Sequence, residues 1–126
     1  MEKQHFLTQA EWQIMELLWQ QPHSLMDLVA KLSVTVGWSK STVATMVRRM
    51  EAKQIITYDT ENRAKIFRAV LGREDAALRE THSLLHRAYH GSIGMMVSAL
   101  AQRDGLTKED IEELYAILKE AEEKDA

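Results

Sequence analysis

The chain has 126 residues, 45% of them hydrophobic, which fits one domain or one small domain with an appendage. It contains no cysteine, which excludes disulfide bonds, thiolate metal sites and cysteine nucleophiles. The sequence shows neither an apolar run long enough to span a bilayer nor a signal-peptide pattern, so we expect a cytoplasmic protein with no membrane partner. The net charge of −3 is unevenly distributed: residues 40–68 hold seven Lys and Arg against three Asp and Glu, a local +4 that suits a phosphate backbone.

Two capped helices are predicted after a short tail at residues 1–6. Thr8–Glu11 is a capping-box pattern, in which the Thr hydroxyl and the Glu carboxylate each accept a hydrogen bond from the other residue's backbone N–H. The helix that follows has an apolar stripe of Trp12, Met15, Leu18 and Trp19. Pro22 ends this helix, and Ser24–Asp27 caps the next one. The second helix carries the apolar residues Leu25, Leu28, Val29 and Leu32.

The segment Trp38–Met50 predicts a third helix with two different faces. Ser39 is placed to cap it, because its side-chain oxygen can accept from a free backbone N–H one turn further on. One face is apolar and holds Val43, Met46, Val47 and Met50. The opposite face holds Ser41, Thr45, Arg48 and Arg49. Hydroxyl and guanidinium groups suit base edges and phosphates, so this face is a candidate DNA reader; an ordinary solvated helix surface is the alternative.

A β-hairpin is predicted next, because the apolar period changes from 3.6 to 2 in residues 56–70. Two strands flank a polar turn at residues 60–63, where Asn62 tolerates the left-handed conformation that a hairpin tip needs. Three short helices followed by a hairpin is the order of a winged-helix domain, in which the second helix of the helix-turn-helix enters the major groove. Arg63 and Lys65 at the tip would then reach neighbouring phosphates or a minor groove.

Further helices are predicted in the last part of the chain. Residues 73–101 indicate a helix that kinks or breaks at Gly91–Gly94, because each glycine in a helix interior costs about 1 kcal/mol. Thr107–Asp110 is a fourth cap, which opens the last helix. The apolar stripe of this last helix consists of Ile111, Leu114, Tyr115 and Leu118.

This last apolar stripe needs a partner. Residues 73–126 are too few for a core of their own, so a homodimer is the simplest way to bury the stripe; packing against the winged domain within one chain is the alternative. Leu85, Tyr89 and Met96 are further candidates for the dimer interface. We therefore predict a mainly α chain with a small β-hairpin, divided into a winged helix-turn-helix DNA-binding domain at residues 1–72 and a helical dimerisation arm at residues 73–126.

Several stretches carry a resemblance to a known family. They are Glu11–Trp19, Trp38–Val43, Tyr89–Ser92 and the closing run Leu106–Leu114. Through them the chain resembles the penicillinase-repressor family, which includes the methicillin-resistance and copper-transport repressors, over about Leu7–Leu118. The resemblance implies a homodimeric winged-helix repressor that binds a palindromic operator with TACA-like half-sites and dimerises through its C-terminal helices. Its positions for DNA contact would be Lys40, Ser41, Thr42, Thr45, Arg48 and Arg49 in the recognition helix, and Arg63 and Lys65 in the wing.

Neither induction route of that family transfers to this chain. The copper-responsive branch carries a cysteine-rich metal site, and this chain has no cysteine. The β-lactam branch is cleaved at an Asn-Phe bond in its dimerisation helices, and the corresponding residues here are Ala99 and Leu100. The sequence therefore leaves open whether a sensor protein or a metal acts as the inducer.

The sequence also contains residues that could support other chemistry. His82, His86 and His90 recur every four residues, so adjacent members can bring two imidazoles onto one metal, but exposed histidines at the edge of a packing face are the simpler interpretation. We expect no metal and no cofactor. The sequence shows neither Ser-His-Asp spacing nor a glycine-rich phosphate loop nor paired acids in an apolar setting, so we do not expect an enzyme. The alternative function is a winged-helix module that binds proteins without DNA, and its binding would depend little on salt.

Overall fold

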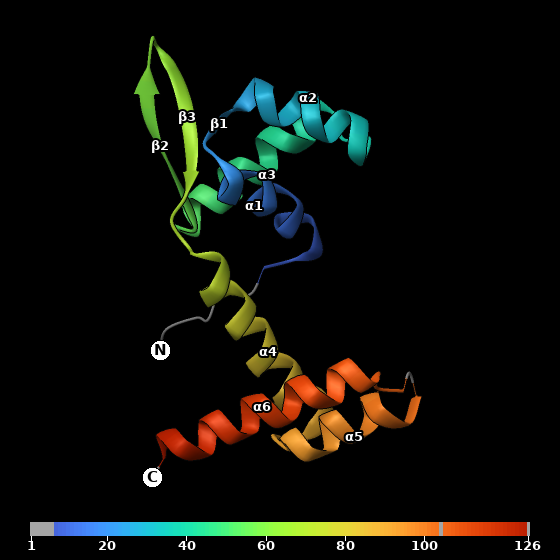
Figure 1. The fold of residues 1–126 in the computed structure, drawn as a ribbon. Helices are drawn as coiled ribbons and strands as arrows, with labels where there is room; N and C mark the ends of the chain where they lie inside the picture. Colours follow the sequence, from blue (N-terminus) through green and yellow to red (C-terminus); the bar gives the residue numbers. More distant parts are fainter. Residues whose placement is uncertain (1–6, 104, 126) are drawn as a thin grey trace. The chain divides into compact units, whose positions relative to one another are not determined.

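The computed structural model describes residues 7–103 and 105–125, so the tail predicted for residues 1–6 lies outside the described residues. The elements occur in this order (Figure 1): α1 (Gln9–Gln20), β1 (His23–Ser24), α2 (Leu25–Thr35), α3 (Lys40–Ala52), β2 (Ile56–Glu61), β3 (Ala64–Ala69), α4 (Arg73–Tyr89), α5 (Ile93–Arg103) and α6 (Lys108–Lys124). The chain forms two compact units, which divide inside α4 between His82 and Ser83. The predicted functional boundary after residue 72 stays a prediction.

The helix starts follow the predicted capping patterns. At α1, the Thr8 hydroxyl accepts from the Glu11 N–H at 3.1 Å, and the Glu11 carboxylate accepts from the Thr8 N–H at 2.8 Å. Satisfying these backbone donors lowers the cost of starting a helix. The structure confirms the remaining predicted caps as well, at Ser24, Ser39 and Thr107.

The sheet of the first unit has three antiparallel strands in the order β1-β3-β2. The short strand β1, which pairs His23 with Phe67, was not predicted from the sequence. The predicted hairpin is present, but its turn is shorter than the predicted residues 60–63, because the strands continue up to Glu61 and from Ala64. Only Asn62 and Arg63 remain in the turn, with φ of 49° and 69°, as a two-residue type I′ connection requires.

The core of the first unit lies between its helices and the sheet. Its fully buried side chains come from α1, α2, α3 and β2, and they are Ile14, Met15, Leu28, Leu32, Val43, Met50 and Ile56. Trp12 and Trp19 pack partly buried against this core, as their predicted apolar stripe requires, and so does Trp38. The Trp19 indole donates to the Leu71 carbonyl at 2.8 Å, which ties α1 to the segment that follows the hairpin.

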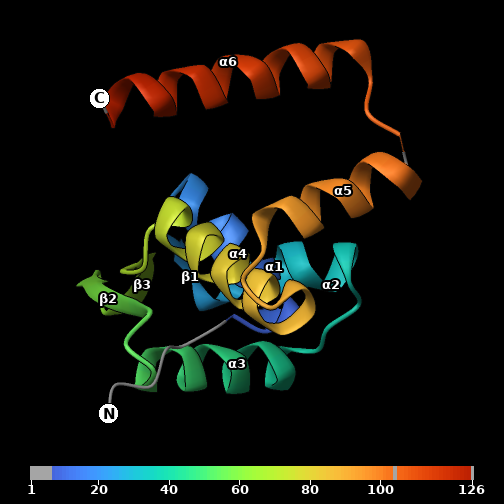
Figure 2. The same cartoon turned by 90° about the horizontal axis from the view of Figure 1, so that it is seen from below.

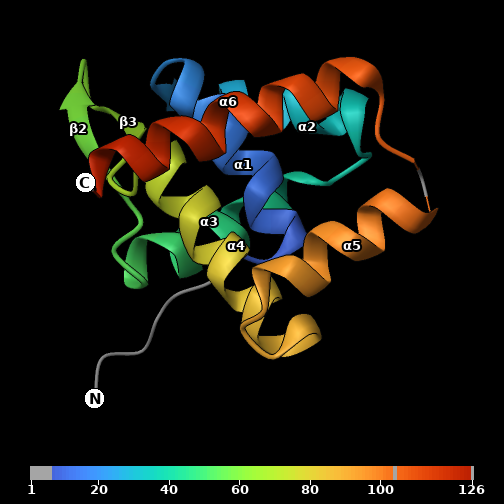
Figure 3. The ribbon, with the colours of Figure 1, turned by 60° about the horizontal axis from the view of Figure 1, so that its bottom comes forward.

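The second unit contains the break predicted at Gly91–Gly94. Helix α4 ends at Tyr89, and His90 and Gly91 both adopt positive φ, with the Gly91 N–H donating to the Leu85 carbonyl. Ser92 then starts α5 by accepting from the Met95 N–H at 3.1 Å. Helices α5 and α6 run in opposite directions (Figure 3). None of the helices in the described parts of the chain combines the length and apolar composition that a membrane crossing needs.

Candidate nucleic-acid interface

The start of α3 is organised around Ser39. Its hydroxyl accepts from the Thr42 N–H at 3.3 Å and lies 3.1 Å from the hydroxyl oxygens of both Ser41 and Thr42. Lys40, the first residue of the helix, is exposed beside them. The cap therefore gathers three hydroxyl groups and a cation at one end of the helix, all exposed to solvent.

Helix α3 is seen from the side in Figure 2. Buried residues on its inner face fix its orientation. Val43, Val47 and Met50 are all buried in the core. Arg48 and Arg49 are therefore held on the outer side, where both are exposed, while Thr45 between the two faces is half-buried. The predicted division of this helix into an apolar and a polar face is confirmed, except that Thr45 from the polar side and Met46 from the apolar side are both half-buried.

The two arginines line different surfaces, although sequence reasoning grouped them together. Arg49 borders a shallow polar depression of about 240 Å³, shared with Ser41, Thr42, Thr45 and Met46. Arg48 borders a separate groove of about 410 Å³, shared with the start of α2 and with β3. They differ because consecutive residues on a helix point about 100° apart. The outer face of α3 thus has a polar flank with Arg49 and a flank toward the hairpin with Arg48.

The hairpin presents its cations in different ways. Arg63 is exposed at the tip, in a left-handed conformation that costs a non-glycine residue roughly 1 kcal/mol. The Lys65 ammonium lies 4.3 Å from the centre of the Tyr58 ring, a cation–π geometry that restrains it. Arg68 pairs with Asp59 at 3.1 Å, which compensates its charge. Arg63 and Lys65 are thus better placed than Arg68 to form a second candidate contact surface for DNA, beside the one on α3.

The predicted DNA-contact residues therefore fall into four places in the first unit. Ser41, Thr42, Thr45 and Arg49 share the polar depression on α3. Arg48 and Lys65, predicted separately from helix and wing, come together in one groove. Lys40 and Arg63 lie at the first residue of α3 and at the hairpin tip.

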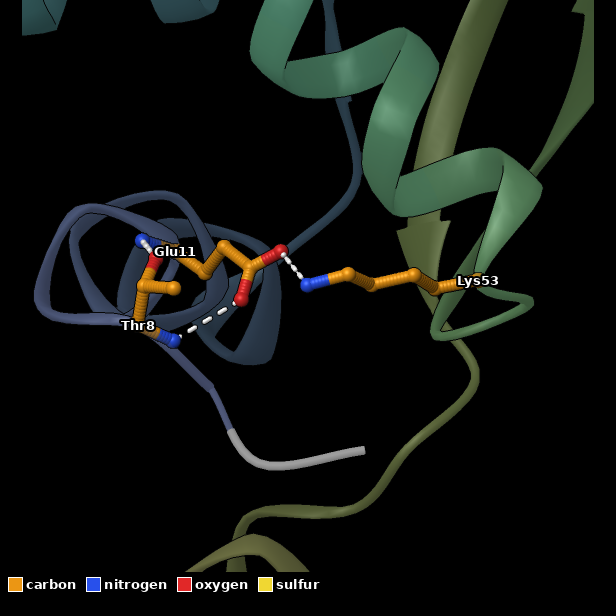
Figure 4. Close-up of polar contacts among 3 residues, drawn as sticks. All are labelled: Thr8, Glu11 and Lys53. Atoms are coloured by element: carbon orange, nitrogen blue, oxygen red, sulfur yellow. Dashed lines mark hydrogen bonds and ion pairs between the residues drawn. The ribbon is translucent and has the colours of Figure 1, made fainter. Parts of the chain in front are cut away.

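One part-buried ion pair in the first unit was missed by sequence reasoning (Figure 4). The Lys53 ammonium, just after α3, lies 2.6 Å from a carboxylate oxygen of Glu11 in α1. The Glu11 side chain is 3% exposed and that of Lys53 is 33% exposed. The capping-box pattern identified Glu11 as a helix-start residue, but no local signal connects it with a lysine 42 positions away. The pair fixes the end of α3 against the start of α1.

The candidate dimer residues belong to the helices from α4 onward. On α6, the predicted stripe lines an apolar groove of about 260 Å³ together with Leu106. Tyr115 is 72% exposed and Leu118 is 63% exposed, so the described residues of the second unit leave most of these two side chains uncovered. The other candidates are half-buried: Leu85 and Tyr89 on α4, and Met96 on α5.

The histidine row does not form a three-residue set. His82 and His86 are exposed on α4, but that helix ends at Tyr89 and His90 follows in a left-handed conformation. The spacing of four residues therefore does not place His90 above the other two. Within residues 7–103 and 105–125, no group of three His, Cys, Asp or Glu side chains is arranged to hold a metal ion.

Three helices, a small antiparallel sheet and an exposed basic surface on α3 and the hairpin define a winged helix-turn-helix protein with a candidate nucleic-acid interface. The family model for the penicillinase repressor matches residues 7–120, and the chain belongs to that family. This confirms the resemblance seen in the sequence.

Known relatives agree with this assignment. The penicillinase repressor of Bacillus licheniformis is 32% identical over 117 residues, covering 90% of each chain. The methicillin resistance regulatory protein MecI of Staphylococcus aureus (strain N315) is 22% identical over 117 residues, covering 92% of this chain and 95% of MecI. Among solved structures, a mutant of Lactococcus lactis ZitR aligns with a TM-score of 0.49 at 16% identity, over 100% of this chain and 80% of ZitR.

Proposed function

We propose that the chain is a transcriptional repressor that binds operator DNA through α3 and the β2–β3 hairpin. Membership of the penicillinase repressor family supports the class of function. The observation that carries the assignment is the exposed outer face of α3, where hydroxyls and arginines are held outward by a buried apolar face. Such side chains supply both base-edge and phosphate contacts. In this proposal residues 1–72 bind DNA and residues 73–126 dimerise.

The proposed repressor acts as a homodimer on a palindromic operator, where it blocks access of the polymerase to the promoter. The exposed apolar stripe on α6 supports dimerisation, because a symmetric partner would cover it with the same stripe of a second copy. A two-fold symmetric dimer presents two copies of α3, and a two-fold operator matches that symmetry.

A titration of labelled operator DNA at two salt concentrations tests the function directly. A protein that neutralises several phosphates loses affinity steeply as salt rises, because it releases condensed counterions from the DNA. We expect such a loss, and we expect weaker binding to random DNA than to the operator. Binding to neither DNA would remove the proposed function and favour the alternative of a protein-binding winged helix.

The two arginines of α3 are expected to have different effects when each is replaced by alanine. Arg49→Ala should cost about 1–3 kcal/mol of operator affinity and relax the sequence preference, since Arg49 shares the polar flank with Ser41 and Thr45. Arg48→Ala should lower the salt slope by about one, as loss of a phosphate contact does. Fluorescence anisotropy on operator and scrambled DNA at two salt concentrations measures both quantities. Unchanged titrations for both variants would contradict the assignment of α3.

The wing is expected to contact sugar and phosphate without reading bases. The double variant Arg63→Ala/Lys65→Ala should therefore weaken operator and random DNA by similar factors. Arg68→Ala is the matched control, since the Arg68 charge is already paired with Asp59, and its effect should be smaller. Thermal melts check for loss of the Lys65–Tyr58 contact, worth about 0.5–1 kcal/mol at an exposed site. An effect confined to the operator would assign sequence reading to the wing.

A further inference from the structure

The groove between the helix-turn-helix and the hairpin has the properties of a small-molecule site. It is an open groove of about 410 Å³ within the first unit, bordered by the start of α2, one flank of α3 and strand β3. Ligand sites in proteins have volumes of a few hundred Å³, mostly apolar walls and a few placed polar groups. Apolar side chains of Leu25, Met26, Ala44, Val47 and Phe67 supply most of this lining.

Three charged side chains complete the groove. Arg48 enters from α3 and Lys65 from β3, and Glu51 lies one turn after Arg48 on the same helix. Their formal charges sum to +1. A bound monoanion would neutralise this charge, whereas a dianion would leave the groove with a net charge of −1. The Lys65 ammonium is restrained over the Tyr58 ring, so part of the entropy of ordering a long side chain is already lost before a ligand arrives.

We propose that this groove binds a small apolar monocarboxylate, with its carboxylate between Arg48 and Lys65 and its apolar body against Val47 and Phe67. A guanidinium and an ammonium are both suited to a carboxylate, and the hydrocarbon part removes apolar wall from water. Bare inorganic phosphate fits less well, because it would leave the apolar wall exposed and would face the Glu51 carboxylate.

This inference rests on the proposed function and supplies its missing regulation. Arg48 and Lys65 also belong to the set of proposed DNA contacts, so a ligand between them withdraws two cations from the DNA backbone at once. Ligand and operator then compete, and by linkage each lowers the affinity for the other. The carboxylate would act as an inducer that needs neither a cysteine metal site nor a cleavable Asn-Phe bond.

The direct test is a nuclear magnetic resonance titration of the full chain with 2-naphthoate, without DNA. We expect shifts concentrated at the groove methyl groups of Leu25, Ala44 and Val47. The neutral analogue 2-naphthylmethanol, with the same ring system, should bind at least about tenfold more weakly, because it lacks the charge-assisted contacts. Absence of groove shifts up to millimolar ligand would overturn the proposal, and equal binding of the alcohol would overturn carboxylate recognition.

Three charge variants separate the groove from the rest of the DNA surface. Arg48→Met and Lys65→Met should each weaken 2-naphthoate about tenfold. Arg49→Met is the matched control, because it removes the neighbouring cation on α3, which lies outside the groove, and it should leave ligand affinity unchanged. Equal losses in all three variants would overturn the location of the site.

Competition with DNA tests the regulatory part. Saturating 2-naphthoate should release labelled operator from the unmodified protein, while 2-naphthylmethanol at the same concentration should not. If the ligand binds in the groove and the operator stays bound, the inducer role is overturned, because the DNA then does not contact Arg48 and Lys65. A protein that binds 2-naphthoate in the groove but never binds DNA would support the ligand site and remove the proposed function, so the two failures are distinguishable.

Discussion

Replacing Leu114 by Asp is expected to give a monomer at micromolar concentration and to abolish tight operator binding. Leu114 lies in the apolar groove of α6, between Ile111 and Leu118. Burial of one leucine contributes about 1.5–3 kcal/mol, and a two-fold interface counts the substitution twice. An unpaired carboxylate in the seam adds a desolvation penalty on both subunits. The dimer dissociation constant should therefore rise by a factor on the order of a hundred or more.

Loss of the dimer should also lower the affinity for the operator, because a monomer contacts only one half-site. Sedimentation and an operator titration on the same sample measure both effects, and weak binding to random DNA should survive. Ala116→Asp is the matched control: it adds the same charge to α6 at an exposed position on the other side of the helix, and it should remain a dimer. Circular dichroism establishes that both variants are folded.

Two results would contradict this mechanism. A Leu114→Asp protein that stays dimeric would place the interface elsewhere, with Leu85, Tyr89 and Met96 as the next candidates. A monomer that still binds the full palindrome tightly would remove dimerisation from DNA recognition. Leu118→Asp, in the same groove and more exposed, repeats the test at an independent position.

Features set by neighbouring residues were predictable from the sequence. A capping box needs only two side chains three positions apart, and the box at Thr8 and the cap at Thr107 formed as predicted, the latter also as a box. The inner and outer faces of α3 followed from helical spacing alone. The break after α4 was also predicted, although His90 joins Gly91 in the left-handed cap and Gly94 lies inside α5.

Features set by distant residues were not predictable. The two-residue strand β1 exists because Ser24 and His23 meet β3 more than 40 positions later, and two residues carry no period of their own. Arg63 adopts a left-handed conformation because the register of β2 and β3 leaves only two residues for the turn. Helical spacing separates Arg48 from Arg49, but which of them shares a groove with Lys65 depends on where the hairpin lies beside α3, and no pattern within the helix contains that information.

The ion pair between Glu11 and Lys53 is such a distant feature, and its removal is expected to destabilise the first unit strongly. Lys53→Met leaves a carboxylate that is 3% exposed with the Thr8 N–H as its remaining donor. Breaking one side of a fully buried pair costs about 3–5 kcal/mol. Because Lys53 itself is 33% exposed, solvent weakens the pair, and we expect about 2–3 kcal/mol for this variant.

A double-mutant cycle separates the pair from the capping role of Glu11. Glu11→Gln keeps an oxygen that can accept from the Thr8 N–H but removes the charge, so it should cost less than Lys53→Met, about 1–2 kcal/mol. Glu11→Gln/Lys53→Met contains no buried charge at this site and should be more stable than the sum of the single effects predicts. The coupling should be about 1–2 kcal/mol.

Urea unfolding of all four proteins at one fixed concentration gives the cycle, since apparent stability depends on concentration if the protein dimerises. Arg73→Met is a control for loss of an exposed pair, because Arg73 meets Glu16 at 3.0 Å with both side chains about half exposed. It should change the free energy of unfolding by less than about 1 kcal/mol. If the changes in unfolding free energy of the two single variants simply add, there is no coupling between Glu11 and Lys53. Each residue would then stabilise the protein only through its own packing, and the apolar contacts of Val47 and Met50 would hold the end of α3.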